Sequence, residues 1–404
     1  MSFPSKRYQR RVGKALDRAL KEAKTDELDI GKERLIVFSD HHKGVRDGAD
    51  DFRESENAYH AALGYYFEAG HILAVLGDVE ELWENDRQPV IDTYEATLEL
   101  ERAFQEAVRT GQDANGARRY WRFWGNHDDD WRFPELVKKY MEPLIHGITV
   151  HESLLLTVKE NGKELGRILF AHGHQGTLYS DQFGALSRIV VRRLWRPIQR
   201  RTRINLNTPS RDWNLRKKHN VALYNWAVKQ EGLVLIAGHT HHPVFSEHER
   251  IAELESELEN AKEGNKADAV AMVRAQLEYE RVFEARRGFT MDQPCYFNTG
   301  CCCFADGDVT GLEINKDGIC LVRWLDDEGK PQPKYLTKPL KFKHVFERVK
   351  KKGEGIKKVN MSEKRLSKRL VMLGIAGALL VVVALGLVIG VARPGQPEPE
   401  SDLE

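Results

Sequence analysis

Short apolar runs, many of them followed directly by histidine or aspartate, constrain the fold of this chain more than any other sequence feature. They are rich in β-branched and aromatic residues and have the length of buried strands. They lie at 35–38, 72–76, 120–124, 154–158, 168–170, 233–237, 295–297 and 319–325. Longer helical stretches separate them, notably 52–69 and 89–110. The alternation predicts an α/β (α+β) domain that becomes more β-rich after residue 290.

The histidines are clustered. Eight of the 15 fall in four windows, Asp40-His41-His42, Asn126-His127-Asp128, His172-Gly173-His174 and His239-Thr240-His241-His242. Each window follows an apolar run, as does Gly77-Asp78. Since the carboxyl ends of strands in an open α/β sheet meet at one crevice, we expect these side chains to converge there. The pattern predicts a metal site.

In chain order the motifs are Asp-x-His, Gly-Asp, Gly-Asn-His-Asp, His-Gly and Gly-His-Thr-His. This order resembles the calcineurin-like metallophosphoesterase superfamily over about residues 33–325. The resemblance implies a four-layer αββα sandwich and two metal ions bridged by Asp78. It also implies that Asp40, His42 and His241 complete the first metal position, and Asn126, His172 and His239 the second.

The same resemblance implies catalytic roles for His127, which would face the substrate, and for Asp128, which would orient it. Two divalent cations suit phosphoester hydrolysis because they activate water and compensate the charge on the phosphoryl oxygens. Imidazole, carboxylate and amide ligands without thiolate favour Mn²⁺, with Fe or Zn²⁺ as alternatives. We expect His41 to be structural, Glu81 and Trp83 to support Asp78, and residues 301–303, three cysteines, to pack in the core.

The substrate class is suggested by two further features. Residues 77–83 and a basic insertion at 178–231 are similar to the UDP-2,3-diacylglucosamine pyrophosphate hydrolases, although that family has arginine where this chain has His127. Positions 188–218 hold eleven Lys/Arg and one acid. This composition favours an anionic partner, and we expect the insertion to form a helical cap that contacts a phosphorylated, lipid-linked or nucleotide-lipid substrate through Arg192, Arg193, Trp195 and Arg196.

The C-terminal region predicts a membrane anchor. Residues 370–392 contain no charge, and 23 residues in a helix cross a hydrocarbon core of about 30 Å. The segment before it, 341–369, holds twelve Lys/Arg and three acids, whereas the tail 393–404 is acidic. The positive-inside rule then predicts a single-pass protein of the cell membrane with its N-terminal catalytic domain in the cytoplasm. The basic runs also predict contact with an anionic membrane surface.

The remaining segments complete the predicted organisation. Residues 1–30 carry a basic amphipathic helix, either packed on the domain or lying on a membrane surface, and residues 31–340 form the metallophosphoesterase domain. A second insertion, 247–287, reads as a helical hairpin. The five cysteines lack the paired spacing of a structural zinc site and indicate reduced thiols.

Whole-chain composition excludes some classes of protein. The chain of 404 residues has 62 Lys+Arg against 61 Asp+Glu and is 41% hydrophobic, which excludes a mostly disordered chain. Its mean hydropathy is below zero, which excludes a multi-span transporter. Three alternatives to a lipid phosphoesterase stay open: a phosphoprotein phosphatase, a nuclease, although nucleic acid is not the expected partner, and a membrane-anchored binding module without turnover.

Overall fold

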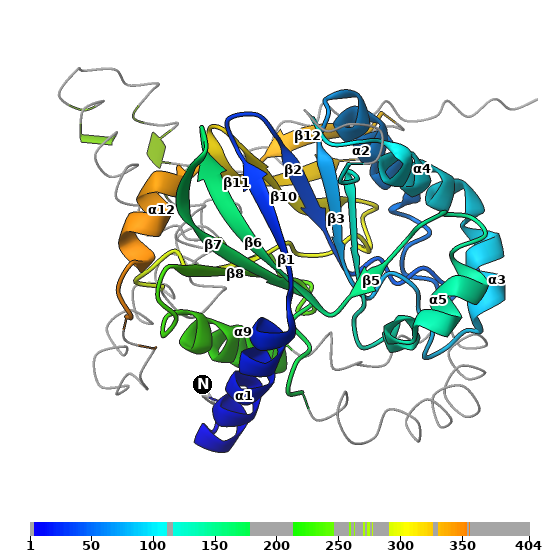
Figure 1. Ribbon diagram of the computed structural model, residues 1–404, viewed down its shortest axis with the longest axis horizontal. Helices are drawn as coiled ribbons and strands as arrows, with labels where there is room; N and C mark the ends of the chain where they lie inside the picture. The colour runs from blue at the N-terminus through cyan, green and yellow to red at the C-terminus, as the bar shows by residue number, and fades with distance from the viewer. Residues whose placement is uncertain are drawn as a thin grey trace, which may run out of the picture. The chain divides into compact units, whose positions relative to one another are not determined.

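A computed structural model describes residues 4–110, 116–177, 213–245, 291–325 and 330–353, with Gly355 and isolated positions between 246 and 290. The described chain forms an α/β fold with two mixed sheets (Figure 1). Its strands are β1 Lys24–Asp29, β2 Leu35–Phe38, β3 Ile72–Leu76, β4 Tyr120–Phe123, β5 Val150–His151, β6 Ser153–Glu160, β7 Lys163–Ala171, β8 Leu233–Ala237, β9 Tyr296–Asn298, β10 Val309–Asn315, β11 Gly318–Leu325 and β12 Gln332–Tyr335. Its helices are α1 Lys6–Glu22, α2 Glu56–Glu68, α3 Arg87–Thr93, α4 Glu95–Glu106, the 3₁₀ helix η1 Asp129–Arg132, α5 Pro134–Tyr140, α9 Trp213–Ala227 and α12 Phe342–Val349.

The two sheets differ in strand order. One runs β1-β6-β7-β8-β9, and the other runs β12-β11-β10-β2-β3-β4-β5. Strands β2, β3, β4 and β5 are parallel, as are β7, β8 and β9, whereas β6 pairs antiparallel with β7, and β10 antiparallel with β2 and β11. Each sheet therefore contributes a set of neighbouring carboxyl ends at which polar side chains can meet.

The alternation of side chains along β2 shows how the layers pack. Leu35 and Val37 lie in a core shared with β6, β7 and β8 of the other sheet, whereas Ile36 and Phe38 lie in a second core with helix α2. Successive strand residues point to opposite faces, so a strand that is apolar throughout must be covered on both sides. The larger sheet is thus packed against the smaller sheet on one face and against helices on the other.

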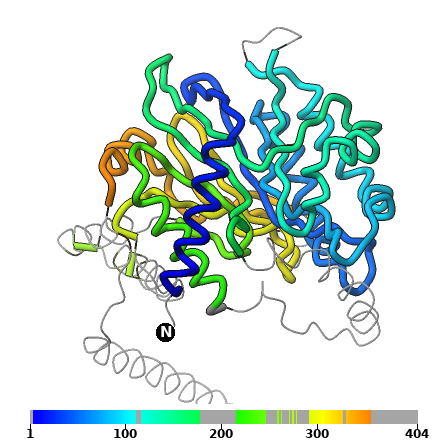
Figure 2. The backbone as a smooth tube through the Cα atoms, turned by 60° about the horizontal axis from the view of Figure 1, so that its bottom comes forward, coloured from blue at the N-terminus to red at the C-terminus, as the bar shows by residue number. Residues whose placement is uncertain are grey.

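Helices cover the outer face of each sheet. Helices α2 and α4 contact β3 and β4 of the larger sheet, and α1, α9 and α12 contact strands of the smaller one. Figure 2 shows α1 running beside α9. Helix α1 begins with Ser5, whose hydroxyl accepts a hydrogen bond from the Tyr8 N–H, and it buries Val12, Leu16 and Ala19. The N-terminal helix is thus packed on the domain.

Most expected strands are present, and several elements differ from the sequence prediction. The expected helical region 1–30 contains a helix only to Glu22 and then the edge strand β1. The stretch 89–110 is divided between α3 and α4. The predicted juxtamembrane segment 341–369 begins with α12, which buries Phe342, Val345, Phe346 and Val349 against β7 and β8.

Other predictions fall largely or wholly outside the described residues. They are residues 178–212 of the cap insertion 178–231, most of the hairpin 247–287, the transmembrane segment 370–392 and the tail 393–404. Within the part of the chain that the structure describes, no helix has both the length and the apolar character needed to cross a bilayer.

Candidate metal centre

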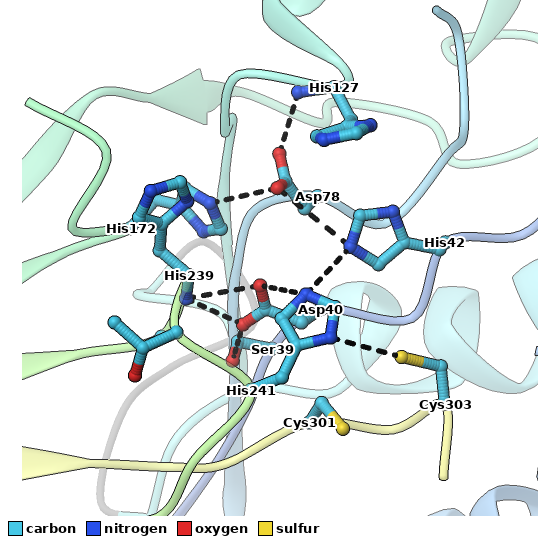
Figure 3. A network of polar contacts seen from close by, with 12 residues as sticks. Ser39, Asp40, His42, Asp78, His127, His172, His239, His241, Cys301 and Cys303 are labelled. Atoms are coloured by element: carbon cyan, nitrogen blue, oxygen red, sulfur yellow. Dashed lines mark hydrogen bonds and ion pairs between the residues drawn. The ribbon is translucent and has the colours of Figure 1, made fainter. Parts of the chain in front are cut away.

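The strand ends bring the expected metal ligands together. Asp40 follows β2, Asp78 follows β3, Asn126 follows β4, His172 follows β7 and His239 follows β8. The backbone joins these ends directly, because the Asp40 N–H donates to the Gly77 carbonyl and the Gly238 N–H to the His172 carbonyl. Figure 3 shows the side chains converging around Asp78. All seven sequence-predicted ligands lie in this region.

Five of the seven ligands have left-handed backbones. Their φ angles are 55° for Asp40, 54° for His42, 50° for Asp78, 67° for His239 and 51° for His241. This conformation is uncommon for residues other than glycine and costs on the order of 1–3 kcal/mol each. Such strain persists only where the surrounding structure imposes it, and its concentration at these five residues makes the strand ends a candidate functional site.

Glycines next to the ligands allow the strand ends to approach closely. A Cβ added to Gly125 would lie 2.6 Å from the Asp78 backbone nitrogen, and one added to Gly77 would lie 2.5 Å from that of Gly125. A side chain at Gly238 would clash with Ser39 and with the carboxylate of Asp40. The glycines in the Gly-Asp, Gly-Asn-His-Asp and Gly-His-Thr-His motifs therefore have a packing role.

Asp40, His42 and His241 form the first group of candidate ligands. Nε2 of His241 lies 3.3 Å from Oδ1 of Asp40 and 3.1 Å from Nε2 of His42. Ligand atoms held at about 2.0–2.2 Å from one ion lie roughly 3 Å apart, so these separations fit a single bound ion. The Asp40 carboxylate also accepts from the His239 N–H and is hydrogen-bonded by the hydroxyl of Ser39.

Asp78, His172 and His239 form the second group. Nε2 of His172 lies 3.0 Å from Oδ2 of Asp78, while its Nδ1 lies 2.7 Å from the carbonyl oxygen of Leu76. That backbone contact fixes which nitrogen faces the site, a role that second contacts of ligand histidines commonly have. Oδ2 of Asp78 also lies 3.9 Å from Nε2 of His42, so Asp78 lies between the two groups.

Asn126 supplies a separate test of whether these residues suit a metal. The residue is only 8% exposed, and its side-chain Oδ1 is buried and has no hydrogen-bond partner among the described residues. A buried amide oxygen without a donor is costly, and a cation would satisfy it. The several buried His/Asp groups and this oxygen have the donor chemistry that divalent metals take.

Charge in the cluster also favours a cation. Burial alone lowers the pKa of His172, but the Asp78 and Asp40 carboxylates outweigh it and raise the pKa to about 9. His42 is affected in the same way, since burial is outweighed by Glu81 and Asp78 and its pKa rises to about 10. Without a metal, the carboxylates therefore hold protons on the rings, and metal binding would release those protons.

His127 lies beside the two groups and is held by residues other than those expected. Its Nδ1 lies 2.7 Å from Oε2 of Glu81, and Trp83 stacks on its ring with centroids 4.3 Å apart. Burial lowers its pKa, but Glu81 and Asp78 outweigh burial and raise the pKa above the ordinary value. The ring is 23% exposed, so an imidazolium there is accessible to a ligand.

Asp128 does not orient His127 in the way the resemblance implies. Its carboxylate instead accepts backbone N–H bonds from Asp78, Val79 and Gly125, at 3.2, 2.9 and 2.5 Å. Burial, with Asp78 and Glu80 nearby, raises the pKa of Asp128 to about 7. Through these hydrogen bonds Asp128 joins the loop after β3 to the loop after β4.

Glu81 is the main residue that sequence reasoning misassigned. We expected it to support Asp78, yet Oε2 of Glu81 lies 2.9 Å from Nδ1 of His42 and also binds His127. Trp83 likewise contacts His127, and its Nε1 donates to the Asn126 carbonyl. The spacing of Glu81, three residues after Asp78, carries no signal for these contacts because they depend on a turn.

The structure agrees with some of the remaining sequence predictions and differs from others. His41 is buried against Phe52 and Tyr59, as expected of a structural histidine. Of the three adjacent cysteines, Cys301 and Cys302 are buried, as the packing interpretation predicts, whereas Cys303 is partly exposed. Cys301 and Cys303 also lie beside His241, which the packing interpretation did not predict. His219 of α9, which sequence analysis did not single out, bonds the Gly173 carbonyl and lies next to His239. The predicted cap residues Arg192, Arg193, Trp195 and Arg196 lie outside the described residues.

The chain matches no protein-family model, and no curated protein matches it.

Proposed function

We propose that this protein is a dinuclear-metal phosphoesterase of the calcineurin-like metallophosphoesterase type. The observation that carries the proposal is the meeting of two three-ligand groups at Asp78, with the His127 ring beside them. The ligand order along the chain and the two face-to-face sheets with helices outside agree with the αββα sandwich of that superfamily. These features support hydrolysis of a phosphoester or a pyrophosphate.

Two divalent ions bound here, Mn²⁺ or alternatively Fe or Zn²⁺, would supply a nucleophile at neutral pH and compensate phosphoryl charge. The chain's own residues then have distinct tasks. Asp78 holds both positions, and its Oδ1 accepts the His127 N–H at 2.7 Å, which links the ligand loop to the catalytic loop. Glu81 orients the His127 ring through Nδ1 and favours its protonated form, which can bind a phosphoryl oxygen or donate its proton to the leaving group.

We further propose that the substrate is lipid-linked or a nucleotide-lipid. This rests on the sequence alone: the apolar segment 370–392 would anchor the enzyme, and the basic insertion 178–231 would contact an anionic lipid face. A tethered enzyme gains effective concentration for substrates in its own leaflet. The similarity of residues 77–83 to the UDP-2,3-diacylglucosamine pyrophosphate hydrolases points to the same class.

The test is a turnover screen of the full chain in detergent, with Mn²⁺ and with a chelator as the metal-free control. The substrates are 4-nitrophenyl phosphate, bis(4-nitrophenyl) phosphate, a UDP-lipid, a phospholipid, a phosphopeptide and single-stranded DNA. We expect metal-dependent hydrolysis, fastest on a lipid-containing substrate. Preference for the phosphopeptide or for DNA would favour a phosphatase or a nuclease, and no turnover at all would leave a binding module.

The variant His127→Ala tests the catalytic assignment. We expect kcat to fall by about 10²–10⁴-fold while the protein retains both metals, since general acid–base groups contribute about that much. The matched control is His146→Ala, because the His146 side chain is almost fully exposed and pairs with Glu142. Loss of both metals from the His127 variant would contradict its proposed role.

A further inference from the structure

Two thiols lie beside the second ring nitrogen of His241. Nε2 of this ring faces Asp40 and His42, while Nδ1 lies 3.6 Å from Sγ of Cys303. The Sγ atoms of Cys301 and Cys303 and a nitrogen of His241 all lie within 4.8 Å of one another. Figure 3 shows both cysteines on the side of His241 away from Asp78.

The backbone holds these thiols in place. Gly300, at φ 82°, turns the chain after β9, and the Cys301 N–H then donates to Oγ1 of Thr310 at 3.1 Å. The next N–H, that of Cys302, donates to the carbonyl oxygens of Ser39 and Asp40. Cys302 enters the core, whereas Cys301 and Cys303 lie beside His241.

The separations suit a thiophilic ion. In a tetrahedral site with Zn–S of about 2.3 Å and Zn–N of about 2.0–2.1 Å, the sulfur and nitrogen ligands lie about 3.5 Å apart. The observed 3.6 Å between Cys303 and His241 is close to that value. Cys301 is buried and Cys303 is partly exposed, so an ion has an entry path from solvent and room for a fourth ligand.

We propose that Cys301, Cys303 and Nδ1 of His241 form a binding site for a thiophilic divalent ion of the Zn²⁺ class. The site differs from the centre at Asp78 because it has sulfur ligands, and it adjoins that centre through the shared imidazole. On binding, two S–H bonds are replaced by two metal–sulfur bonds, and the proton on Nδ1 of His241 is also displaced when Nε2 binds the other ion. All of these protons pass to solvent, so no oxidant is needed. The soft sulfur ligands select Zn²⁺ over Mn²⁺ or Mg²⁺.

The test is a Co²⁺ titration of the full chain, stripped of metal and kept reduced by a phosphine. Cobalt bound through nitrogen and oxygen alone gives only weak visible absorption, whereas thiolate ligands add an intense near-ultraviolet charge-transfer band. We expect that band in the wild type and its displacement by Zn²⁺, which binds such ligands more tightly than Co²⁺. Cys303→Ser should lose most of it, and the double variant C301S/C303S all of it.

The matched controls are Cys302→Ser and Cys320→Ser, which alter buried thiols that do not face His241 and should keep the band. Asp78→Asn should also keep it, which separates this proposal from the phosphoesterase assignment. The proposal is overturned if reduced wild-type protein shows no thiolate band, if the band survives in C301S/C303S, or if it disappears in Cys320→Ser. A Cys301–Cys303 disulfide that yields no band after reduction also overturns it.

Discussion

Two buried clusters of charged side chains adjoin each other at the ends of β2 and β3, and they are built in opposite ways. In the closed charge cluster, formed by Lys43, Glu80, Glu101 and Arg122, two cations balance two carboxylates. Lys43 Nζ lies 2.8 Å from Glu101, and Arg122 contacts both Glu80 and Glu101. None of the four has a positive φ. This cluster stabilises the fold.

The candidate metal cluster next to it, formed by the seven proposed ligands, gathers carboxylates against imidazoles, with five of these residues at positive φ and the Asn126 Oδ1 without a described donor. The sequence interleaves the two clusters, since Lys43 follows His42 directly and Glu80 lies between Asp78 and Glu81. Burial of charge therefore does not by itself mark a functional site. Backbone strain distinguishes the two, as does the pairing of carboxylates with imidazoles, which titrate near neutral pH, in place of lysine and arginine.

The largest effect is expected from Asp78→Asn, which removes the proposed ligand of both metal positions. Turnover of the proposed phosphoesterase should fall on the order of 10⁴-fold, because the two ions would supply both the nucleophile and the charge compensation. The unfolding free energy of the metal-free protein should fall by less than in Glu101→Gln, because His172 and His42 can release the protons that Asp78 holds on them. Metal analysis, an activity assay and urea unfolding check this, with exposed Asp92→Asn as the control.

The contrary outcome is that Asp78→Asn keeps its metals and loses as much unfolding free energy as a variant with a truncated core side chain. Asp78 would then have a structural role, like the residues of the closed charge cluster.

The opposite result is expected from Glu101→Gln. Removing its charge leaves Lys43 and Arg122 buried without their counter-ion, and breaking a buried pair in this way costs about 3–5 kcal/mol. Chemical unfolding measures the loss, and the matched control is Glu99→Gln on the same helix, where the side chain is about half exposed. The folded fraction of Glu101→Gln should still bind metal at the wild-type ratio; a lost metal would mean that the two clusters act as one.

A smaller effect, on metal affinity, is expected from Glu81→Gln. Glu81 is not one of the proposed ligands but contacts one of them, His42. Glu81 holds Nδ1 of His42, whereas the matching contact of His172 is to a backbone carbonyl. We therefore expect the affinity of the first metal position to fall by about 10–100-fold and the second to change much less. Metal titration tests this, with exposed Glu54→Gln as the control. Equal weakening of both positions would remove the distinction between side-chain and backbone support.

The sequence was sufficient to predict the strands and the convergence of their ends, because the apolar runs are short and buried on both faces, and several are followed within two or three residues by histidine or aspartate. Strand β2 and the loop ending at Asp78 are examples. It was not sufficient for β1, whose sequence Lys-Thr-Asp-Glu-Leu-Asp is polar and which pairs only at a sheet edge. Edge pairing is set by the neighbouring strand, and β1 has only one apolar residue.

Within the site, sequence identified residues on strand ends but not the contacts that turns create. Asp128 and Glu81 exchanged their expected partners because each side chain reaches across a loop, so that chain spacing does not determine its direction. The same holds for Cys301 and Cys303, whose approach to His241 depends on the turn at Gly300.

The smallest predicted effect is the pH dependence of the difference in unfolding free energy between the wild type and Glu101→Gln. Burial alone raises the pKa of Glu101, but Lys43 and Arg122 outweigh it and hold the pKa below the ordinary 4.5. A carboxyl whose pKa is lower in the folded state stabilises fully above its unfolded pKa and loses that contribution as pH falls through the folded pKa. Glutamine does not titrate, so the stability gap between wild type and variant should narrow below about pH 4.5, by at most about 1.4 kcal/mol per pH unit. Urea midpoints measured from pH 7 to 3.5 test this, with Glu99→Gln as the control, and a gap that stays constant or widens in acid would contradict the closed, balanced character of the cluster.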